Sequence, residues 1–172
     1  ANRDWPEARG IFHNDEKTFL VWVNEEDQMR IISMQPGADA AQVFSRLARG
    51  IDAIEARINA AGYEFAHNDH LGYIHSCPTN VGTGMRASVH VKIPNLSTHP
   101  AFRDICAKLR LQPRGIHGEH SQSAGGVVDL SNKERLGKSE VQLVQTMIDG
   151  VSKILELEAS LANGGEVTAD SV

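Results

Sequence analysis

The sequence lacks the features that would place it in several special classes of protein. Its 172 residues contain 2 cysteines, Cys77 and Cys106, which are too few for a disulfide framework and have no Cys-x-x-Cys spacing for zinc. No apolar run approaches the about 18 residues of a membrane helix, and no basic start with an apolar segment predicts a signal peptide. With 15 glycines and 6 prolines, the composition also excludes a collagen-like or low-complexity chain. A net charge of −5 argues against a general nucleic-acid binder.

What is present is the composition of an ordinary globular domain with an unusual choice of basic residues. The chain is 41% hydrophobic and 23% charged, which is typical of one domain with a hydrophobic core. Of its 17 basic residues, 11 are arginine and 6 are lysine. Arginine presents a planar fork of donors that binds carboxylates and phosphates through two hydrogen bonds. The alternative is a general preference for arginine on the surface. The positions of the arginines must therefore decide between a binding role and this preference.

Hydrophobic patterning predicts a hairpin and a long helix in the first half of the chain. Residues 18–24 and 28–34 are rich in strand-forming residues and flank a polar turn, which predicts an antiparallel hairpin. Residues 39–61 carry apolar side chains at spacings of three and four, which predicts a helix that ends at Gly62. Two further strands are expected at residues 71–76 and 86–93.

The second half predicts two more helices and a glycine-rich loop. A short helix is expected at residues 100–111, a long loop at 114–126 and a short strand at 127–130. The last helix begins near Ser139, where Gln142 completes a capping box. Because strands and helices mix without regular βαβ alternation, the fold class predicted is α+β, an antiparallel β-sheet flanked by helices.

Three carboxylates gather in the predicted turn of the hairpin. Glu25, Glu26 and Asp27 are consecutive, and Arg30 follows three residues later. Carboxylates at this position can bind a cationic substrate or act as a general base. A solvated turn is the alternative.

A second candidate is the segment that begins at Cys77. Hydroxyl donors and nearby cations lower the pKa of a thiol, and Thr79 and Arg86 are placed to supply them. A small buried cysteine at a strand end is the alternative. Cys106 lies in a predicted helix beside apolar neighbours and is expected in the core.

Four arginines are expected at strand ends or loop edges, where a bound polyphosphate is within reach. They are Arg30, Arg86, Arg114 and Arg135. The Gly82-Thr83-Gly84 segment lacks P-loop spacing and is weak evidence for a phosphate site. The His-x-x-His pairs fall in predicted loops, so no transition-metal site is expected. His90 shares the polar face of its predicted strand with Arg86, and either a ligand site or a strand-edge histidine explains it.

In this order and spacing, these segments resemble the phosphagen kinases, the ATP:guanidino phosphotransferases that include creatine, arginine, glycocyamine, taurocyamine and lombricine kinases. The resemblance extends to about residue 162. The segments that carry it are Asp4-Trp-Pro-Glu-Ala-Arg-Gly-Ile11, Phe19-Leu-Val-Trp-Val-Asn-Glu-Glu-Asp27, Cys77-Pro-Thr-Asn-Val-Gly-Thr-Gly84, Asp129-Leu-Ser-Asn132 and Arg135-Leu-Gly137.

The resemblance implies a role for each matching residue. Glu26 would orient the guanidinium and accept its proton, and Cys77 would be a thiolate kept ionised by Thr79. The four arginines named above would surround the nucleotide phosphates and the transferring group. Glu119 would be a second guanidinium carboxylate, as in arginine-kinase-like members. The other implied nucleotide-binding positions are Ala87, Ser88, Val89, His90, Gly115, Ile116, His117, Gly118 and Asp129.

The resemblance also implies the cofactors, the partners and the organisation of the chain. The nucleotide would be Mg-ATP or Mg-ADP, with Mg²⁺ held by phosphates and water rather than by a protein cage, and the loop 115–123 would close over it. Residues 1–162 would be the later part of the catalytic domain and 163–172 a flexible tail, without the family's N-terminal helical domain. A guanidino substrate, no nucleic acid, no membrane, a cytoplasmic location and a homodimer are expected. The alternative is a non-catalytic, self-associating fragment of such a kinase.

Overall fold

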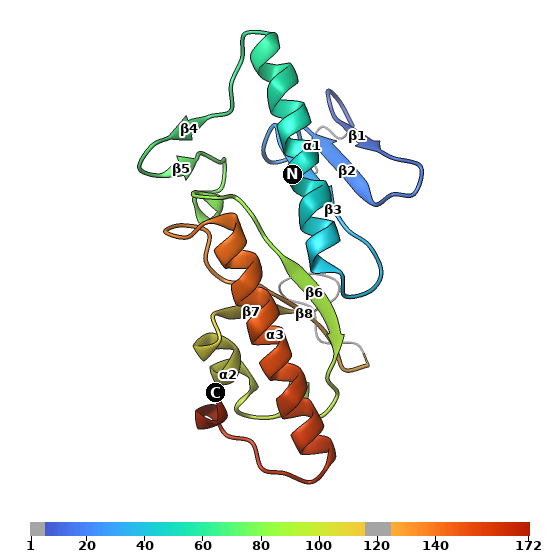
Figure 1. The fold of residues 1–172 in the computed structure, drawn as a ribbon, viewed down its shortest axis with the longest axis vertical. Coiled ribbons are helices and arrows are strands. Elements are labelled where there is room, and N and C mark those ends of the chain that lie inside the picture. Colours follow the sequence, from blue (N-terminus) through green and yellow to red (C-terminus); the bar gives the residue numbers. More distant parts are fainter. Residues whose placement is uncertain (1–5, 116–124) are drawn as a thin grey trace. The chain divides into compact units, whose positions relative to one another are not determined.

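The computed structural model describes residues 6–115 and 125–172, which divide into two compact units (Figure 1). Unit 1 is Ala1–Gly84 and unit 2 is Met85–Val172. The length of the chain predicts one domain, whereas each unit has its own three-stranded sheet and its own long helix. The predicted α+β class is confirmed, because all strand pairs of the described residues are antiparallel.

Unit 1 is built on a three-stranded sheet in the order β1-β2-β3. The predicted hairpin is confirmed as β2 and β3, in which Phe19 lies opposite Ser33 and Val23 opposite Met29. The elements of unit 1 are β1 Gly10–His13, β2 Phe19–Val23, β3 Met29–Ser33, α1 Ala40–Ala60, β4 His67–Asn68, β5 Gly72–Tyr73 and the 3₁₀ turn η1 Pro78–Asn80.

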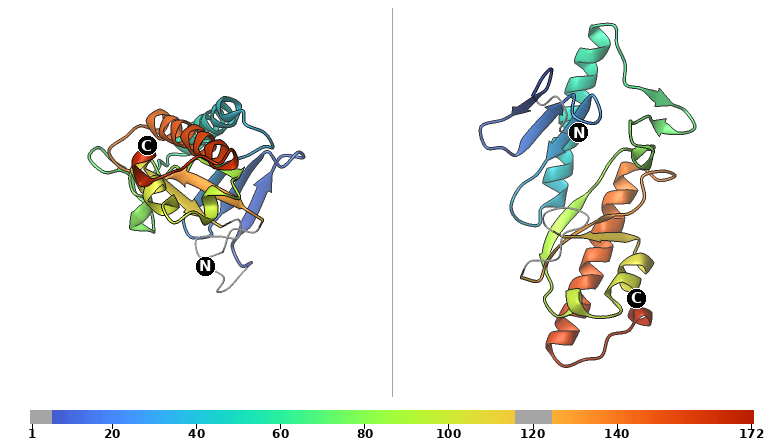
Figure 2. Two further views of the ribbon diagram at one scale, coloured as in Figure 1. Left: turned by 90° about the horizontal axis from the view of Figure 1, so that it is seen from below. Right: turned by 180° about the vertical axis from the view of Figure 1, so that it is seen from behind.

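The helix α1 lies along one side of this sheet (Figure 2). It begins as predicted, because the Asp39 side chain accepts a hydrogen bond from the Gln42 N–H at 2.9 Å. A Cβ atom on Gly50 would overlap the Phe19 ring, so the absence of a side chain at Gly50 lets the helix approach β2 closely. The predicted apolar face of α1 is only half-buried, because none of its residues is fully buried.

Unit 2 places a long helix across a sheet in the order β6-β8-β7 (Figures 1 and 2). In α3 the predicted capping box is confirmed: Ser139 Oγ accepts from the Gln142 N–H at 3.3 Å, and Gln142 Oε1 accepts from the Ser139 N–H at 2.9 Å. The elements of unit 2 are β6 Ser88–Lys92, η2 Leu96–Thr98, α2 Phe102–Lys108, β7 Leu111–Arg114, β8 Val127–Asn132, α3 Glu140–Ala162 and η3 Ala169–Ser171.

The main hydrophobic core lies in unit 2, between the sheet, α2 and α3. Ile93, Ile105, Leu130 and Ile154 are all 0% exposed. Burial of a side chain of this size contributes about 1.5–3 kcal/mol, so these contacts hold the sheet firmly in place. The alternation predicted for residues 86–93 is confirmed, since Ile93 and its alternate neighbours face this core.

Several element boundaries differ from the sequence-based expectation. The strand β1 and the strand β7 were not predicted, and the strand expected at residues 71–76 is reduced to β5. The helix expected at 100–111 ends at Lys108, because Arg110 adopts a left-handed φ of 57° that stops a helix. The chain then enters β7.

The residues expected to form a flexible tail pack against unit 2 in the structure. Val167 is 6% exposed, and the Lys108 ammonium lies 2.7 Å from Asp170 Oδ1. Because both charged side chains remain exposed, this ion pair forms without a large desolvation penalty. Across the described ranges, no helix combines the length and the apolar character needed to cross a membrane.

Candidate active site

The candidate residues form two clusters, one in each unit. In unit 1, the turn between β2 and β3 carries the carboxylates, and Arg30 lies directly opposite Trp22 in the strand register. The Arg30 guanidinium stacks 5.3 Å from the centre of the Trp22 ring. Its Nη2 lies 3.2 Å from Glu25 Oε2 and 3.8 Å from Glu26 Oε2. The carboxylate pair therefore already holds one planar guanidinium.

Cys77 lies immediately before η1, with its side chain half-buried. Its Sγ is 2.9 Å from Thr79 Oγ1, which is the contact expected of a hydroxyl that stabilises a thiolate. Cys106, in contrast, is 0% exposed, and burial raises the pKa of its thiol to about 12. The prediction that Cys106 belongs to the core is confirmed, and the two thiols have opposite environments.

The carboxylate turn and the cysteine segment are tied together within unit 1. Asp27 Oδ1 accepts a hydrogen bond from the Ser76 N–H at 2.6 Å, and the Ser76 hydroxyl donates to the Glu26 carbonyl at 2.9 Å. Burial acts to raise the pKa of Asp27, but the bonds from Ser76 and the nearby His75 outweigh it and hold the pKa below its ordinary value. These ties were not predicted, because no local pattern links residues 49 positions apart.

In unit 2, three predicted residues form a row across the sheet. Asp129 on β8 lies opposite His90 on β6 and opposite Arg114 on β7. Directly opposed residues in antiparallel strands project from the same face, so this row lies on the face opposite the core residue Leu130. His90 Nε2 is 3.9 Å from Asp129 Oδ1.

Two further arginines join this row. Arg86 pairs with Asp129 Oδ2, and the Asp129 side chain is only 10% exposed. Arg135 donates through Nη1 to the carbonyls of Asn132 and Lys133, each at 3.0 Å. Burial, followed by the charges of Arg114 and Arg86, lowers the pKa of Arg135, which is the direction expected when both guanidinium groups repel that of Arg135. An anion would relieve that repulsion.

Asn132 is a residue of this cluster that the sequence analysis did not assign to the site. It is 1% exposed, its Oδ1 accepts from the Ala87 N–H at 2.7 Å, and its Nδ2 donates to the carbonyls of Met85 and Glu134. It thereby fixes the backbone on both sides of Arg86. The only signal for it in the sequence is its place at the end of the Asp129–Asn132 segment.

The remaining predicted positions lie beside or beyond this cluster. Ser88, Val89 and His90 belong to β6, Ala87 directly precedes it, and Gly115 directly follows β7. Four predicted positions lie outside the described residues, so their geometry is not assigned; they are Ile116, His117, Gly118 and Glu119. Within the described ranges, no group of three His, Cys, Asp or Glu side chains is arranged to bind a metal ion.

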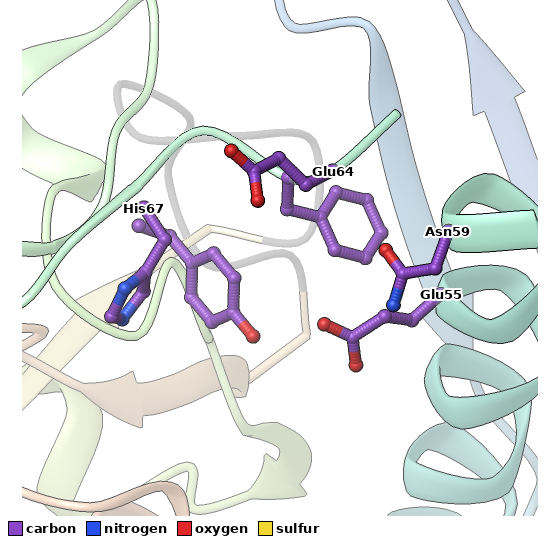
Figure 3. Close-up of a pocket in the computed structure, with 6 residues that line it drawn as sticks. Glu55, Asn59, Glu64 and His67 are labelled. Atoms are coloured by element: carbon purple, nitrogen blue, oxygen red, sulfur yellow. The ribbon is translucent and has the colours of Figure 1, made fainter. Parts of the chain in front are cut away.

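Unit 1 also contains an open pocket of about 330 Å³ that is separate from the carboxylate turn (Figure 3). Figure 3 shows Glu55 and Asn59 on α1 at one side of the pocket and Glu64 and His67 at the other side. The ring of Tyr73 completes the lining beside His67, with the two ring centroids 5.0 Å apart. None of these residues is a predicted catalytic or nucleotide-binding residue.

Comparison with known proteins identifies relatives along almost the whole chain. Residues 1–161 match the family model of the ATP:guanido phosphotransferase C-terminal catalytic domain. An arginine kinase from Anthopleura japonica is 59% identical over 163 residues, which cover 93% of this chain and 22% of the relative. A creatine kinase B-type from Gallus gallus is 53% identical over 165 residues, which cover 96% of this chain and 43% of the relative.

Solved structures give the same result. A crystal structure of a lombricine kinase is 52% identical and superposes with a TM-score of 0.90, over 95% of this chain and 45% of that one. The chain thus spans less than half the length of these relatives. The predicted family is confirmed: the chain belongs to the ATP:guanido phosphotransferases and corresponds to their C-terminal catalytic domain.

Proposed function

We propose that the protein carrying this chain transfers the γ-phosphoryl group of Mg-ATP reversibly to a guanidinium nitrogen of arginine or a related guanidino compound. In the forward direction a nitrogen–phosphorus bond forms and the bond between the γ-phosphorus and the β–γ bridging oxygen breaks. The proton leaves the attacking nitrogen for the Glu26 carboxylate, and ADP is released. Since phosphoryl transfer through a loose transition state needs little covalent chemistry, the protein acts mainly by alignment and charge neutralisation.

One observation carries this proposal above all: a carboxylate pair that binds a guanidinium is hydrogen-bonded to the segment of a half-buried thiol. Glu25 and Glu26 hold the guanidinium of Arg30 in the structure, so the chemistry of the turn suits a planar cation. Ser76 is hydrogen-bonded to this turn, and Cys77 is the residue that follows Ser76 in the chain. A substrate guanidinium would lie between the Glu26 carboxylate and the Cys77 thiolate.

The arginine cluster of unit 2 supports the nucleotide half of the reaction. Arg86 pairs with the carboxylate of Asp129, and the positive charges of Arg114 and Arg86 both act on Arg135. Such a cluster fits the equatorial oxygens of a transferring phosphoryl group and the phosphates of ADP. Because the clustered side chains are cationic, Mg²⁺ would be held by the phosphates and by water, and we assign no protein ligand to it.

The choice of guanidino substrate rests on the resemblance at Glu119. A second carboxylate there favours an arginine-kinase-like substrate, because a creatine kinase carries an apolar residue at the matching position. Ile116 and His117 depart from the commoner family pattern. Glycocyamine, lombricine and taurocyamine are therefore also tested as substrates. The Glu119→Val variant should weaken use of the guanidine more than nucleotide binding; an equal loss of both would argue against this role.

A coupled assay of ADP release tests the proposed reaction. The protein that carries this chain is supplied with Mg-ATP and, in turn, arginine, glycocyamine, creatine, lombricine and taurocyamine. We expect turnover with at least one of them, and a loss of about 100-fold or more in kcat for Cys77→Ala, because the aligned thiolate is removed (about 1.4 kcal/mol per tenfold). Phosphorylation of no guanidine would refute the proposed function.

The second cysteine offers a matched control for this assay. Cys106→Ala also removes a thiol, but from the core of unit 2 rather than from the candidate site. It should lower the melting temperature while leaving turnover at 25 °C close to that of the unaltered protein. The similarity to enzymes named as kinases does not favour the alternative of a non-catalytic, self-associating fragment.

A further inference from the structure

Three contacts join the carboxylate turn of unit 1 to the two residues that precede Cys77. One oxygen of Asp27 accepts the Ser76 N–H at 2.6 Å, and its other oxygen lies 3.5 Å from His75 Nδ1. The Ser76 hydroxyl donates to the Glu26 carbonyl at 2.9 Å. We call Asp27, His75 and Ser76 the Asp27 clamp. None of the three belongs to the catalytic or nucleotide-binding residues assigned above.

The imidazole of His75 is held on two sides. Nδ1 faces the Asp27 carboxylate, and the Nε2 and Cε1 edge packs on the backbone of Gly84. A Cβ atom at Gly84 would overlap that edge of the ring, and Gly84 has a left-handed φ of 61° that other residues rarely adopt. The ring is 21% exposed, and within the described part of the chain its buried Nε2 has no hydrogen-bond partner. The ring packed in this way directs Nδ1 at Asp27.

The clamp acts where the proposed reaction needs precision. Ser76 bonds to the backbone of Glu26 itself and is the residue next to Cys77. The hydrogen bonds therefore set the distance between the strand turn that carries the Glu26 carboxylate and the segment that carries the Cys77 thiol. Misplacement of reacting groups by about 1 Å can lower a rate about 100-fold.

We propose that His75 and Ser76 are positioning residues that act together with Asp27 to hold Glu26 and Cys77 at the separation required to align a guanidinium group. This inference rests on the proposed function. His75 and Ser76 touch neither substrate in this scheme, and they act through the backbone of the two catalytic residues. Their loss should affect the guanidine side of the reaction and spare the nucleotide side.

Steady-state kinetics of the protein that carries this chain test the inference. We expect Ser76→Ala and His75→Gln each to lower kcat/KM for the guanidine about tenfold or more, while KM for Mg-ATP changes less than twofold. Ser76→Thr keeps the hydroxyl and should restore most of the loss, which a general packing role would not predict. Exchange of the Ser76 amide proton should accelerate in Asp27→Ala, because its acceptor is removed.

Matched control variants use exposed residues of unit 1. Ser45→Ala and Asp52→Asn on α1 and His70→Gln beyond it should leave all kinetic constants within twofold. An active protein in which Ser76→Ala and His75→Gln behave like these controls would refute the clamp and leave the proposed function standing. A well-folded protein with no activity toward any guanidine would overturn both. Equal loss in the guanidine and Mg-ATP constants would also refute the clamp, since it would indicate general damage.

Discussion

Replacing Asn132 by alanine removes three hydrogen bonds from the interior of unit 2. The amide oxygen accepts from the Ala87 N–H at 2.7 Å, and the amide nitrogen donates to the Glu134 carbonyl at 2.7 Å and the Met85 carbonyl at 3.2 Å. The side chain is 1% exposed, so water does not readily replace these partners. Asn132→Ala leaves the Ala87 N–H without this acceptor and removes one donor from each of two backbone carbonyls.

The cost follows from these contacts. Each lost hydrogen bond contributes about 1 kcal/mol, and a stranded buried N–H adds to that sum. We expect Asn132→Ala to lower the free energy of unfolding by about 3–4 kcal/mol, a large share of the about 5–15 kcal/mol that stabilises a domain. Since the segment that carries Arg86 loses its anchor, ADP affinity should fall about tenfold or more under conditions in which the variant remains folded.

The assay must report on unit 2. Both tryptophans of the chain, Trp5 and Trp22, precede Met85, so tryptophan fluorescence reports on unit 1. Urea unfolding followed by far-UV circular dichroism, together with hydrogen exchange of the β8 amides, measures the change. Asn163→Ala is the matched control, because this exposed amide makes one hydrogen bond to the Ala159 carbonyl at 2.9 Å. A loss below about 1 kcal/mol for Asn132→Ala, or no greater than that of the control, would refute the reasoning.

Three other predictions test the charges and thiols of the two clusters. In the native protein at pH 8, a thiol reagent should modify Cys77 and not Cys106, because Cys106 is buried and its thiol has a pKa of about 12. Both cysteines should react in urea. Rapid modification of both in the native protein would contradict the assigned burial of Cys106. Arg135→Gln should raise the Kd for ADP, measured by calorimetry, about tenfold, because a guanidinium group of the cluster is lost. The control variant Arg57→Gln on α1 should change this Kd less than twofold. Equal effects of the two variants would argue against an anion site. Because the pKa of Asp27 is lower in the folded state, its contribution to stability is complete above its unfolded pKa of about 3.9 and is lost as the pH falls through the folded value. The urea midpoint of Asp27→Asn should therefore fall less steeply between pH 5 and pH 3 than that of the unaltered protein, and parallel curves would contradict the stabilisation of this carboxylate by Ser76 and His75.

Features that depend on neighbouring residues were predictable from the sequence. The hairpin of β2 and β3, the start of α1 at Asp39 and the capping box of Ser139 and Gln142 all follow from local spacing. The opposition of Trp22 and Arg30 also follows once the hairpin register is known.

Features that depend on tertiary partners were not predictable. The strand β7 contains Pro113, which argues against a strand, yet β7 lies at the edge of its sheet, where a missing N–H costs no central ladder bond. The strand β1 has the sequence Gly-Ile-Phe-His, in which apolar and polar residues do not alternate, and all four residues are exposed. The tail was expected to be flexible because chain ends are often poorly ordered, but Val167 is 6% exposed and belongs to the core of unit 2.

The polar residues that sequence analysis could not assign to catalysis share one physical role. Asp27 stands beside Glu26 in one segment and binds the backbone of Ser76, next to Cys77. Asn132 closes the Asp129 segment and binds the backbone of Ala87 beside Arg86. In each unit, a side chain from one family segment thus fixes the backbone of a residue that directly adjoins another candidate site residue. The chain therefore contains two kinds of polar residue, chemical groups for the proposed reaction and polar anchors that set their separation. A variant of an anchor should change alignment while every reactive group remains present.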